Sequence, residues 1–262
     1  MPPFITLQIF LKKQLKSILC KNGYILMSQT KPDLPIEASL RDRKILSLVE
    51  PFTMTTPERV WALMSAVSYC SSNIPGDFVE CGVWRGGSAM VMAYTLLELG
   101  ITDTKIWLYD TFEGMTSPSS HDVELASGIE AKDLMAAAGL KKEKTRNVWC
   151  YATQGDVSEN LRTTGYPASS LHLIKGDVIT TLKRDIPDKI SLLRLDTDFY
   201  ESTLYELETL YPRLQPGGVC IIDDYGYWSG SKKATDEYIS KHKIKVLLNV
   251  IDTTGRMFIK PF

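Results

Sequence analysis

Two short apolar runs, each followed at once by a pair of acidic residues, constrain the fold of this chain more than any other feature. The first run, Ile190–Leu195, ends in Asp196-Thr197-Asp198, and the second, Gly218–Ile222, ends in Asp223-Asp224. Short apolar runs of this kind are typical of buried parallel strands. Ligands of an open α/β sheet bind outside the carboxyl ends of its strands, and neighbouring strands lie roughly 4.8 Å apart. Four carboxylates would therefore crowd together, which requires a cation or shared protons and points to a hard divalent metal ion.

The rest of the chain alternates between predicted strands and helices. Further strands are expected at residues 77–81, 105–109 and 171–175, with helices at 57–73, 89–100 and 201–210 between or before them. Residues 243–250 and 256–260 are typical of a terminal hairpin. Such alternation predicts an α/β fold with a doubly wound, mostly parallel sheet and a late antiparallel element.

One connection, residues 111–170, is too long for a plain crossover. Connections of about 60 residues in a compact domain are usually functional lids or insertions. We expect two helices in it, around residues 129–140 and 156–162, lying over the site. The predicted organisation is thus a helical extension over residues 1–50 and a main domain over residues 51–262.

The first 24 residues are predicted to form an amphipathic helix. Apolar residues recur there at near-helical spacing, and lysines follow the apolar stretch. A signal peptide would carry its charges before that stretch. The helix is expected to pack on a partner subunit or on the domain, with peripheral contact to a membrane surface as the alternative. No apolar run reaches the ~20 residues that a spanning helix needs.

Composition excludes some partners and suggests a compartment. The 30 basic and 31 acidic residues give no electrostatic case for nucleic acid. The five cysteines are scattered without zinc-binding spacing. A reducing cytoplasm is the simplest setting for them.

A glycine-rich turn follows the first predicted strand, and an acid ends the second. The turn reads Glu80-Cys-Gly82-x-x-x-Gly86-Gly87-Ser88, with glycines where backbone must approach a ligand closely and a helix begins. Asp110 can accept hydrogen bonds from both hydroxyls of a ribose. Nicotinamide enzymes and S-adenosylmethionine (SAM) enzymes share this arrangement, but the nicotinamide fingerprint G-x-G-x-x-G is absent. Glu80 also suits the charged amino or sulfonium end of SAM better than a pyrophosphate.

Four segments, at residues 78–87, 110–114, 193–198 and 212–225, resemble the motifs of the macrocin O-methyltransferase family. Its members are SAM- and magnesium-dependent enzymes that methylate sugar hydroxyls of macrolide and aminocoumarin antibiotics. The resemblance covers roughly residues 52–238. It implies a seven-stranded sheet of the class I SAM methyltransferase type with a helical lid insertion.

The resemblance also implies roles for the acids. Asp196, Asp223 and Asp224 would hold Mg²⁺, and Asp198 would be the general base. Residues two apart on a strand point the same way, so Asp196 and Asp198 can face one site. Thr197 replaces the glycine that the family usually has between them. The cofactor-binding residues expected are Met54, Glu80, Gly82, Gly86, Ser88, Asp110, Phe112, Gly176 and Asp177.

The predicted function is therefore magnesium-dependent methyl transfer from SAM to a hydroxyl of a small natural product, in the first place a sugar hydroxyl of a glycoside or polyol. A phenol or catechol methyltransferase is the alternative within this chemistry. A nucleotide-binding oxidoreductase and a non-catalytic SAM-binding protein are alternatives of other classes. Because the family often forms dimers through N-terminal helices, we also expect a homodimer.

Overall fold

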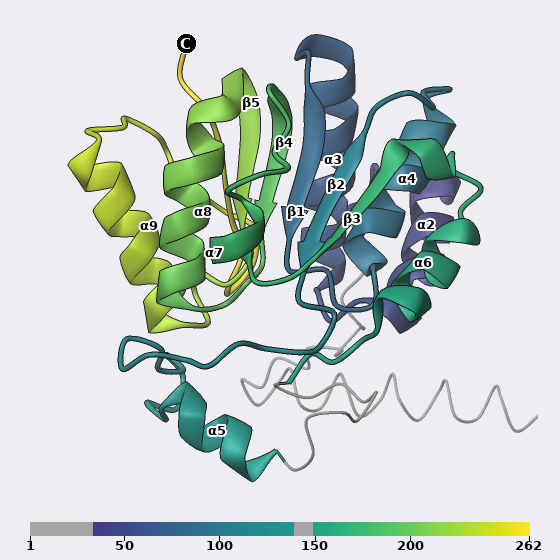
Figure 1. The fold of residues 1–262 in the computed structure, drawn as a ribbon. Helices are drawn as coiled ribbons and strands as arrows, with labels where there is room; N and C mark the ends of the chain where they lie inside the picture. The colour runs from purple at the N-terminus through teal and green to yellow at the C-terminus, as the bar shows by residue number, and fades with distance from the viewer. Residues whose placement is uncertain (1–33, 139–148) are drawn as a thin grey trace, which may run out of the picture. The chain divides into compact units, whose positions relative to one another are not determined.

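The sheet has the topology expected from the alternation of elements. A computed structural model of the chain describes residues 34–138 and 149–262; the helix predicted within residues 1–24 lies outside them. Within this part, one sheet has the order β3-β2-β1-β4-β5-β7-β6, parallel except for β7, which is antiparallel to both its neighbours (Figure 1). The strands are β1 Asp77–Cys81, β2 Ile106–Asp110, β3 Leu171–Lys175, β4 Ile190–Leu195, β5 Leu214–Ile222, β6 Asn249–Val250 and β7 Arg256–Ile259.

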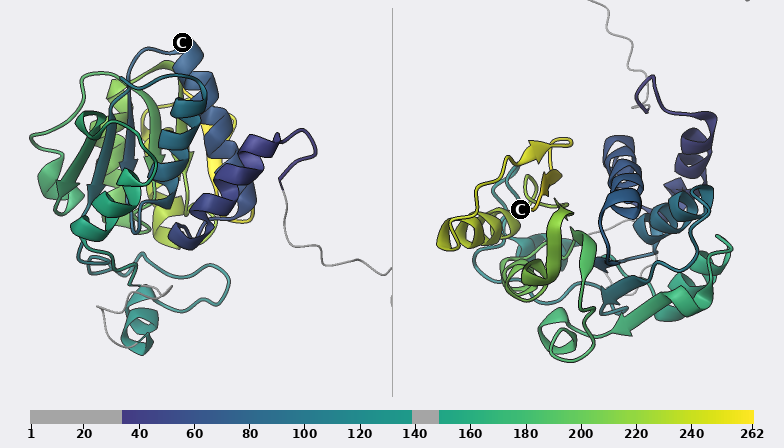
Figure 2. Two further views of the ribbon diagram at one scale, coloured as in Figure 1. Left: turned by 90° about the vertical axis from the view of Figure 1, so that its right-hand side faces the viewer. Right: turned by 90° about the horizontal axis from the view of Figure 1, so that it is seen from above.

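Helices cover both faces of the sheet (Figure 2). The α-helices are α2 Leu40–Val49, α3 Pro57–Asn73, α4 Gly87–Glu98, α5 Ala131–Ala137, α6 Gln154–Arg162, α7 Val178–Thr181, α8 Tyr200–Leu210 and α9 Ser229–Lys241. Successive strand residues point to opposite faces. Phe78 and Leu192 accordingly join the core beneath α2, α3, α4 and α6, whereas Val79 and Leu193 join the core beneath α7, α8 and α9.

Several expected boundaries differ from those observed. The first strand of the terminal hairpin was predicted over residues 243–250 but contains only Asn249–Val250. Strand β5 begins at Leu214, ahead of the apolar run predicted over Gly218–Ile222, and its register with β4 is irregular between Leu214 and Val219. The compact unit that contains the sheet begins at Leu34. Helix α2, predicted to belong to a separate extension, is therefore part of the main domain.

The two helices of the 111–170 connection have different positions. Helix α5 packs through Ala131 and Met135 against Phe199 and Trp228, below the carboxyl ends of the strands (Figure 1). Helix α6 instead packs against α4 and β3. The expectation that both helices lie over the site is therefore wrong for α6, because its apolar side chains belong to the core on one face of the sheet.

Among the described residues, no helix combines the length and apolarity needed to cross a bilayer. Cys70, Cys81 and Cys220 are buried and form no disulfide bond.

Candidate active site

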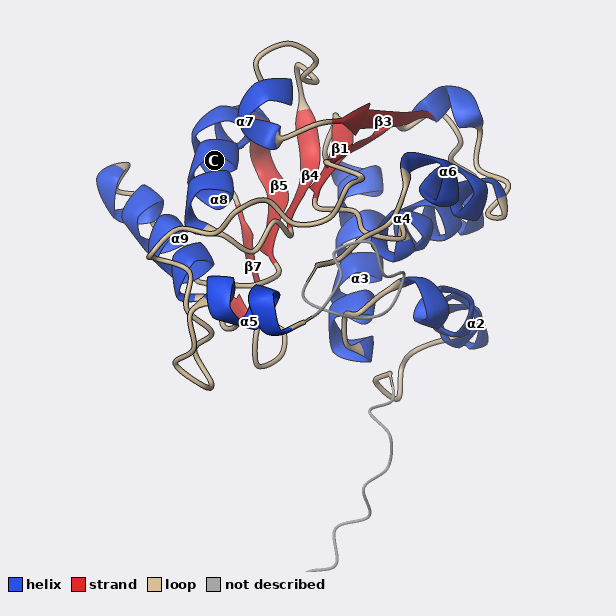
Figure 3. Ribbon diagram, turned by 60° about the horizontal axis from the view of Figure 1, so that its bottom comes forward, coloured by secondary structure: helices blue, strands red, loops and turns tan. Residues whose placement is uncertain are grey.

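The predicted site lies in a cavity of about 480 Å³ at the carboxyl ends of β1, β2, β4 and β5. Figure 3 turns this edge toward the viewer, and loops and α5 cross in front of the strand ends. All of the predicted site residues line the cavity except Glu80, Gly86 and Phe112. The cavity sits where the strand order reverses between β1 and β4, which is where open α/β sheets bind ligands.

Three of the predicted acids do crowd together. One carboxylate oxygen from each of Asp196, Asp223 and Asp224 lies within 4.8 Å of the other two. Burial raises the pKa of Asp196 well above its ordinary value despite the nearby Arg194 guanidinium, and the negative charges of Asp223 and Asp224 add to the rise. Burial raises the pKa of Asp224 in the same direction.

Arg194 joins these acids to Glu80. It lies in strand β4 opposite Glu80 of β1, and its Nη1 is 2.6 Å from Glu80 Oε1 and 2.7 Å from Asp196 Oδ2. Its Nη2 is 2.7 Å from Asp223 Oδ1. The guanidinium side chain is only 3% exposed, so these ion pairs are poorly screened.

Arg59, from the first turn of α3, approaches Asp223 from the other side. Its Nη1 forms an ion pair with Asp223 Oδ2, and its Nε is 3.0 Å from Asp252 Oδ2. Asp252 also accepts hydrogen bonds from Thr56 Oγ1 and from the backbone N–H of Gly255. The turn after β6 therefore fixes the direction in which Arg59 points.

Asp224 has no such partner. No ion pair from a described basic side chain reaches it, and its buried Oδ2 has no hydrogen-bond partner among the described residues. Buried charge of this kind is costly unless it is paired. Three carboxylates with oxygen-only donors fit a hard cation such as Mg²⁺, so Asp196, Asp223 and Asp224 are suited to hold one.

Asp198 sits on a γ-turn at the end of β4. Its φ is +67°, and the N–H of Phe199 donates to the carbonyl oxygen of Thr197 across it at 2.7 Å. A non-glycine residue held there stores backbone strain, which is common at functional sites. The indole Nε1–H of Trp228 donates to Asp198 Oδ1 at 2.9 Å. Burial raises the pKa of Asp198 to about 8, and the charge of Asp196 adds to the rise.

Thr197, the residue between the two acids, also has a buried partner. Its Oγ1 donates to Oε2 of Glu206 on α8 at 3.1 Å. Burial raises the pKa of Glu206 well above its ordinary value. A glycine at this position would lack this bond to α8.

The glycine turn after β1 brings two strands close together. Gly82 has a φ of +82°, and a Cβ on it would lie 1.9 Å from the carbonyl oxygen of Asp196. Only glycine fits at this point, which lets the glycine turn and the acidic pair share one cavity. Gly82 and Ser88 both line it, and this glycine-lined start of α4 fits the close backbone approach that a SAM site needs.

Asp110 organises this turn. Its Oδ2 accepts from the N–H groups of Val83 at 2.7 Å and Trp84 at 3.0 Å, and its Oδ1 accepts from that of Phe112 at 2.6 Å. Burial raises its pKa, although these hydrogen bonds act in the opposite direction. The carboxylate lines the cavity and at the same time fixes the shape of the glycine turn.

Three predicted cofactor residues do not line the cavity. Glu80 is fully buried and pairs with Arg194, and burial raises its pKa to about 7. Phe112 is 2% exposed and belongs to the core beneath α4. Gly86 is the N-cap of α4, against Val157. In this structure all three support residues that line the cavity.

Sequence reasoning missed Arg59, Asp252 and the role of Arg194. An arginine inside a buried apolar strand needs an acidic partner. The sequence could therefore have predicted that Arg194 pairs with acids of the site. Arg59 and Asp252 are 193 positions apart in the sequence and meet only through the fold. No local pattern could have paired them.

The sheet order and the position of the cavity define an α/β methyltransferase fold of the class I SAM type. A solved structure of the O-methyltransferase NovP superposes with a TM-score of 0.69 at 30% identity, covering 80% of this chain and 83% of that one. The model of the family described as macrocin-O-methyltransferase (TylF) matches residues 11–260, and the chain belongs to this family. It is thus a SAM-dependent O-methyltransferase, and the oxidoreductase alternative is wrong.

Two curated relatives have assigned substrates. The 8-demethyl-8-(2,3-dimethoxy-alpha-L-rhamnosyl)-tetracenomycin-C 4'-O-methyltransferase of Streptomyces olivaceus is 33% identical over 196 residues, 72% of this chain and 69% of the relative. The demethyldecarbamoylnovobiocin O-methyltransferase of Streptomyces niveus is 33% identical over 184 residues, 70% of this chain and 66% of the relative.

Proposed function

We propose that the enzyme transfers the SAM methyl group to a sugar hydroxyl of a small glycoside and that the reaction requires Mg²⁺. The observation that carries this proposal is the cluster of Asp196, Asp223 and Asp224, whose carboxylate oxygens lie within 4.8 Å of one another beside Asp198. One relative is named for a reaction on a rhamnosyl group of an antibiotic, which supports a sugar as the acceptor.

The binding roles follow from the positions around the cavity. Asp196, Asp223 and Asp224 would hold Mg²⁺, and the turn at Gly82–Ser88 with Asp110 and Asp177 would hold SAM. When bound, SAM supplies an activated methyl group, and Mg²⁺ lowers the pKa of a neighbouring hydroxyl and orients it. Arg59 and Arg194 hold Asp223 from both sides and limit the negative charge of the cluster.

Asp198 would remove the acceptor proton. A sugar hydroxyl is a poor nucleophile at neutral pH, so a positioned base is needed. Trp228 holds Oδ1 of Asp198 through its indole N–H. This leaves Oδ2 to accept the proton, and the γ-turn holds the carboxyl at the cavity wall. Orientation of this kind contributes several kcal/mol to such reactions.

A second cavity of about 700 Å³ adjoins the first and shares Met115, Thr116, Asp177 and Ser202 with it. Met115, Met135 and Phe199 give it an apolar side, while Lys132 and Glu201 are polar residues of its wall. We assign it to the part of the acceptor beyond the methylated sugar. An apolar aglycone suits such a lining.

The remaining expectations are part of the same proposal. A cytoplasmic homodimer, with the N-terminal residues contributing to the subunit contact, suits a small-molecule enzyme of this family. Size-exclusion chromatography with light scattering measures the oligomeric state directly.

The acceptor class is tested by supplying labelled SAM and Mg²⁺ with matched panels of glycosides, their aglycones and simple catechols. We expect label in the glycoside panel, on a sugar oxygen, and loss of transfer with a chelator. Transfer to catechols alone would replace the glycoside by a phenol as the acceptor. Full activity after chelation would refute the role of Mg²⁺.

A further inference from the structure

Asp122, in the connection between β2 and α5, is a buried carboxylate with both oxygens bonded. It is 1% exposed. Its Oδ1 accepts from the backbone N–H of Tyr200 at 2.8 Å, and its Oδ2 accepts from the N–H of Ser119 at 2.7 Å and from its Oγ at 2.8 Å. A carboxylate is buried at low cost only with such donors around it, so its position is closely specified.

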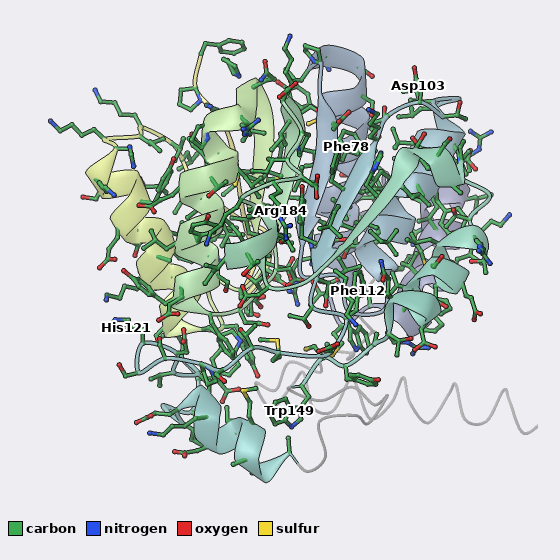
Figure 4. The ribbon with its side chains drawn as sticks, viewed as in Figure 1. Phe78, Asp103, Phe112, His121, Trp149 and Arg184 are labelled. Atoms are coloured by element: carbon green, nitrogen blue, oxygen red, sulfur yellow. The ribbon has the colours of Figure 1, made fainter. Side chains whose placement is uncertain are left out.

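The bond to Tyr200 caps helix α8 from outside its own segment. Tyr200 is the first residue of α8, and the side chain of the N-cap residue, Phe199, makes no capping hydrogen bond. A carboxylate near the first N–H groups of a helix replaces that cap and interacts favourably with the helix dipole. Figure 4 labels His121, the neighbour of Asp122, by the lower ends of α8 and α9.

The residue held in this way follows directly after the catalytic turn. Asp198 occupies the γ-turn closed by the N–H of Phe199, and Tyr200 comes next. Fixing the N–H of Tyr200 therefore fixes one end of the turn that presents Asp198. The other end is held by the bond between Thr197 and Glu206.

The same connection also holds the partner of the Asp198 side chain. The N–H of Ser229 donates to the carbonyl of Val123 at 2.9 Å, and the N–H of Leu125 donates to the carbonyl of Tyr227 at 2.9 Å. These bonds hold the segment that carries Trp228, which donates to Asp198 Oδ1.

Gly230 permits this packing against Asp122. A Cβ on Gly230 would lie 1.8 Å from Asp122 Oδ1 and 2.8 Å from the backbone nitrogen of Tyr200. The contact between the connection and the starts of α8 and α9 thus leaves no room for a side chain.

We propose that Asp122 is a positioning residue for Asp198, and that residues 119–125 are a fixed wall of the site. Asp122 holds the main-chain turn of Asp198 through Tyr200, while its neighbours Val123 and Leu125 hold Trp228 against the Asp198 carboxyl. This role rests on the proposed function, because it assumes that Asp198 takes the acceptor proton.

The test compares Asp122→Ala, Asp122→Asn and Gly230→Ala, with Asp133→Ala as the control on the exposed side of α5. The first readout is the indole N–H resonance of Trp228 in ¹⁵N-labelled protein without ligands, assigned through Trp228→Phe. The indole of Trp107, which donates to Asp77 near the amino ends of β2 and β1, is the internal reference. We expect Asp122→Ala and Gly230→Ala to shift the Trp228 signal and to leave that of Trp107 in place.

The second readout is turnover. We expect Asp122→Ala to lower kcat about a hundredfold, the scale of a misplaced catalytic group, with the Kd of SAM close to wild type, because Asp122 does not line the first cavity. Asp122→Asn should recover part of the rate, because its amide oxygen can still accept from Tyr200. Asp133→Ala should match wild type in both readouts.

Wild-type kcat and an unshifted Trp228 resonance in Asp122→Ala would overturn the proposal. If Asp122→Ala does not fold, the same two measurements on Asp122→Asn test the proposal. A wild-type kcat and an unshifted Trp228 resonance in Asp122→Asn would then overturn the proposal. A wild-type enzyme that methylates no hydroxyl acceptor would refute the proposed function instead. The resonance of Trp228 would then still decide whether Asp122 holds the environment of Asp198.

Discussion

Glu80 and Arg194 lie opposite each other on β1 and β4, and their 2.6 Å ion pair is buried beneath the acidic cluster. The arginine extends from this pair to Asp196 and Asp223. The guanidinium of Arg194, which lies inside the sheet, thus holds Asp196 and Asp223 at the carboxyl ends of the strands. Glu80 in turn holds Arg194 in place.

Arg194→Met should destabilise the protein by about 3 kcal/mol or more, because it leaves three acids without their shared partner in a buried site. Urea denaturation without metal measures this change. Arg41→Met is the control, since Arg41 is 72% exposed and pairs with Glu98 at the surface; its effect should stay within about 0.5 kcal/mol. Equal changes in the free energy of unfolding for the two variants would show that Arg194 does not stabilise the buried acids.

Trp228→Phe should lower kcat about tenfold to a hundredfold while SAM binds as in wild type, because Asp198 loses the donor that orients it. Steady-state methyl transfer and calorimetry with SAM give the two values. Trp107→Phe removes a different indole, bonded to Asp77 away from the cavity, and should keep the wild-type kcat. Loss of SAM binding in Trp228→Phe would show a role in the cofactor pocket instead.

Asp252→Ala should weaken Mg²⁺ binding although Asp252 is not a proposed ligand, because Arg59 loses the contact that directs it at Asp223. The unpaired N–H of Gly255 should add about 1–3 kcal/mol of destabilisation. Calorimetric titration with Mg²⁺ and urea denaturation measure both effects. Asp188→Ala, at a fully exposed position, is the matched control and should change neither.

Mg²⁺ binding should release protons and tighten as the pH rises. Burial raises the pKa of Asp196, Asp224 and Asp198, the last to about 8. In the metal-free protein these carboxyl groups therefore stay protonated at pH values where an ordinary Asp, with a pKa of ~3.9, is ionised. Because the folded state then binds more protons than the unfolded one, the contribution of Asp198 to stability falls between pH ~4 and about 8. Calorimetry in buffers of different ionisation enthalpy counts the released protons; uptake, or none, would contradict the raised pKa values.

The acids and the sheet could be predicted because their signals are local. A strand and the acid at its end are adjacent in sequence, so Asp196, Asp198, Asp223 and Asp224 were placed at one edge correctly. Gly82 was predicted to let a ligand approach the backbone closely. In the structure, the backbone carbonyl of Asp196 is what leaves no room for a side chain at this position.

What could not be predicted depends on contacts between distant segments. Asp122 meets Tyr200 across 78 positions of sequence, and an isolated acid in a long connection gives no sign of its partner. Helix α6 has the periodicity of any amphipathic helix, and only its packing on α4 shows which surface it covers. The short β6 has exposed residues, so its apolar run carried no reliable strand signal.

A Mg²⁺ titration of Asp224→Asn beside wild type, with methyl transfer measured in the same samples, tests the proposed metal site most directly. Asp224 is the best position because it pairs with neither Arg59 nor Arg194, so its neutralisation leaves no arginine without an acid. We expect Asp224→Asn to keep the fold and the Kd of SAM but to lose Mg²⁺ binding and methyl transfer together. Wild-type methyl transfer by Asp224→Asn at the same Mg²⁺ concentration would contradict it.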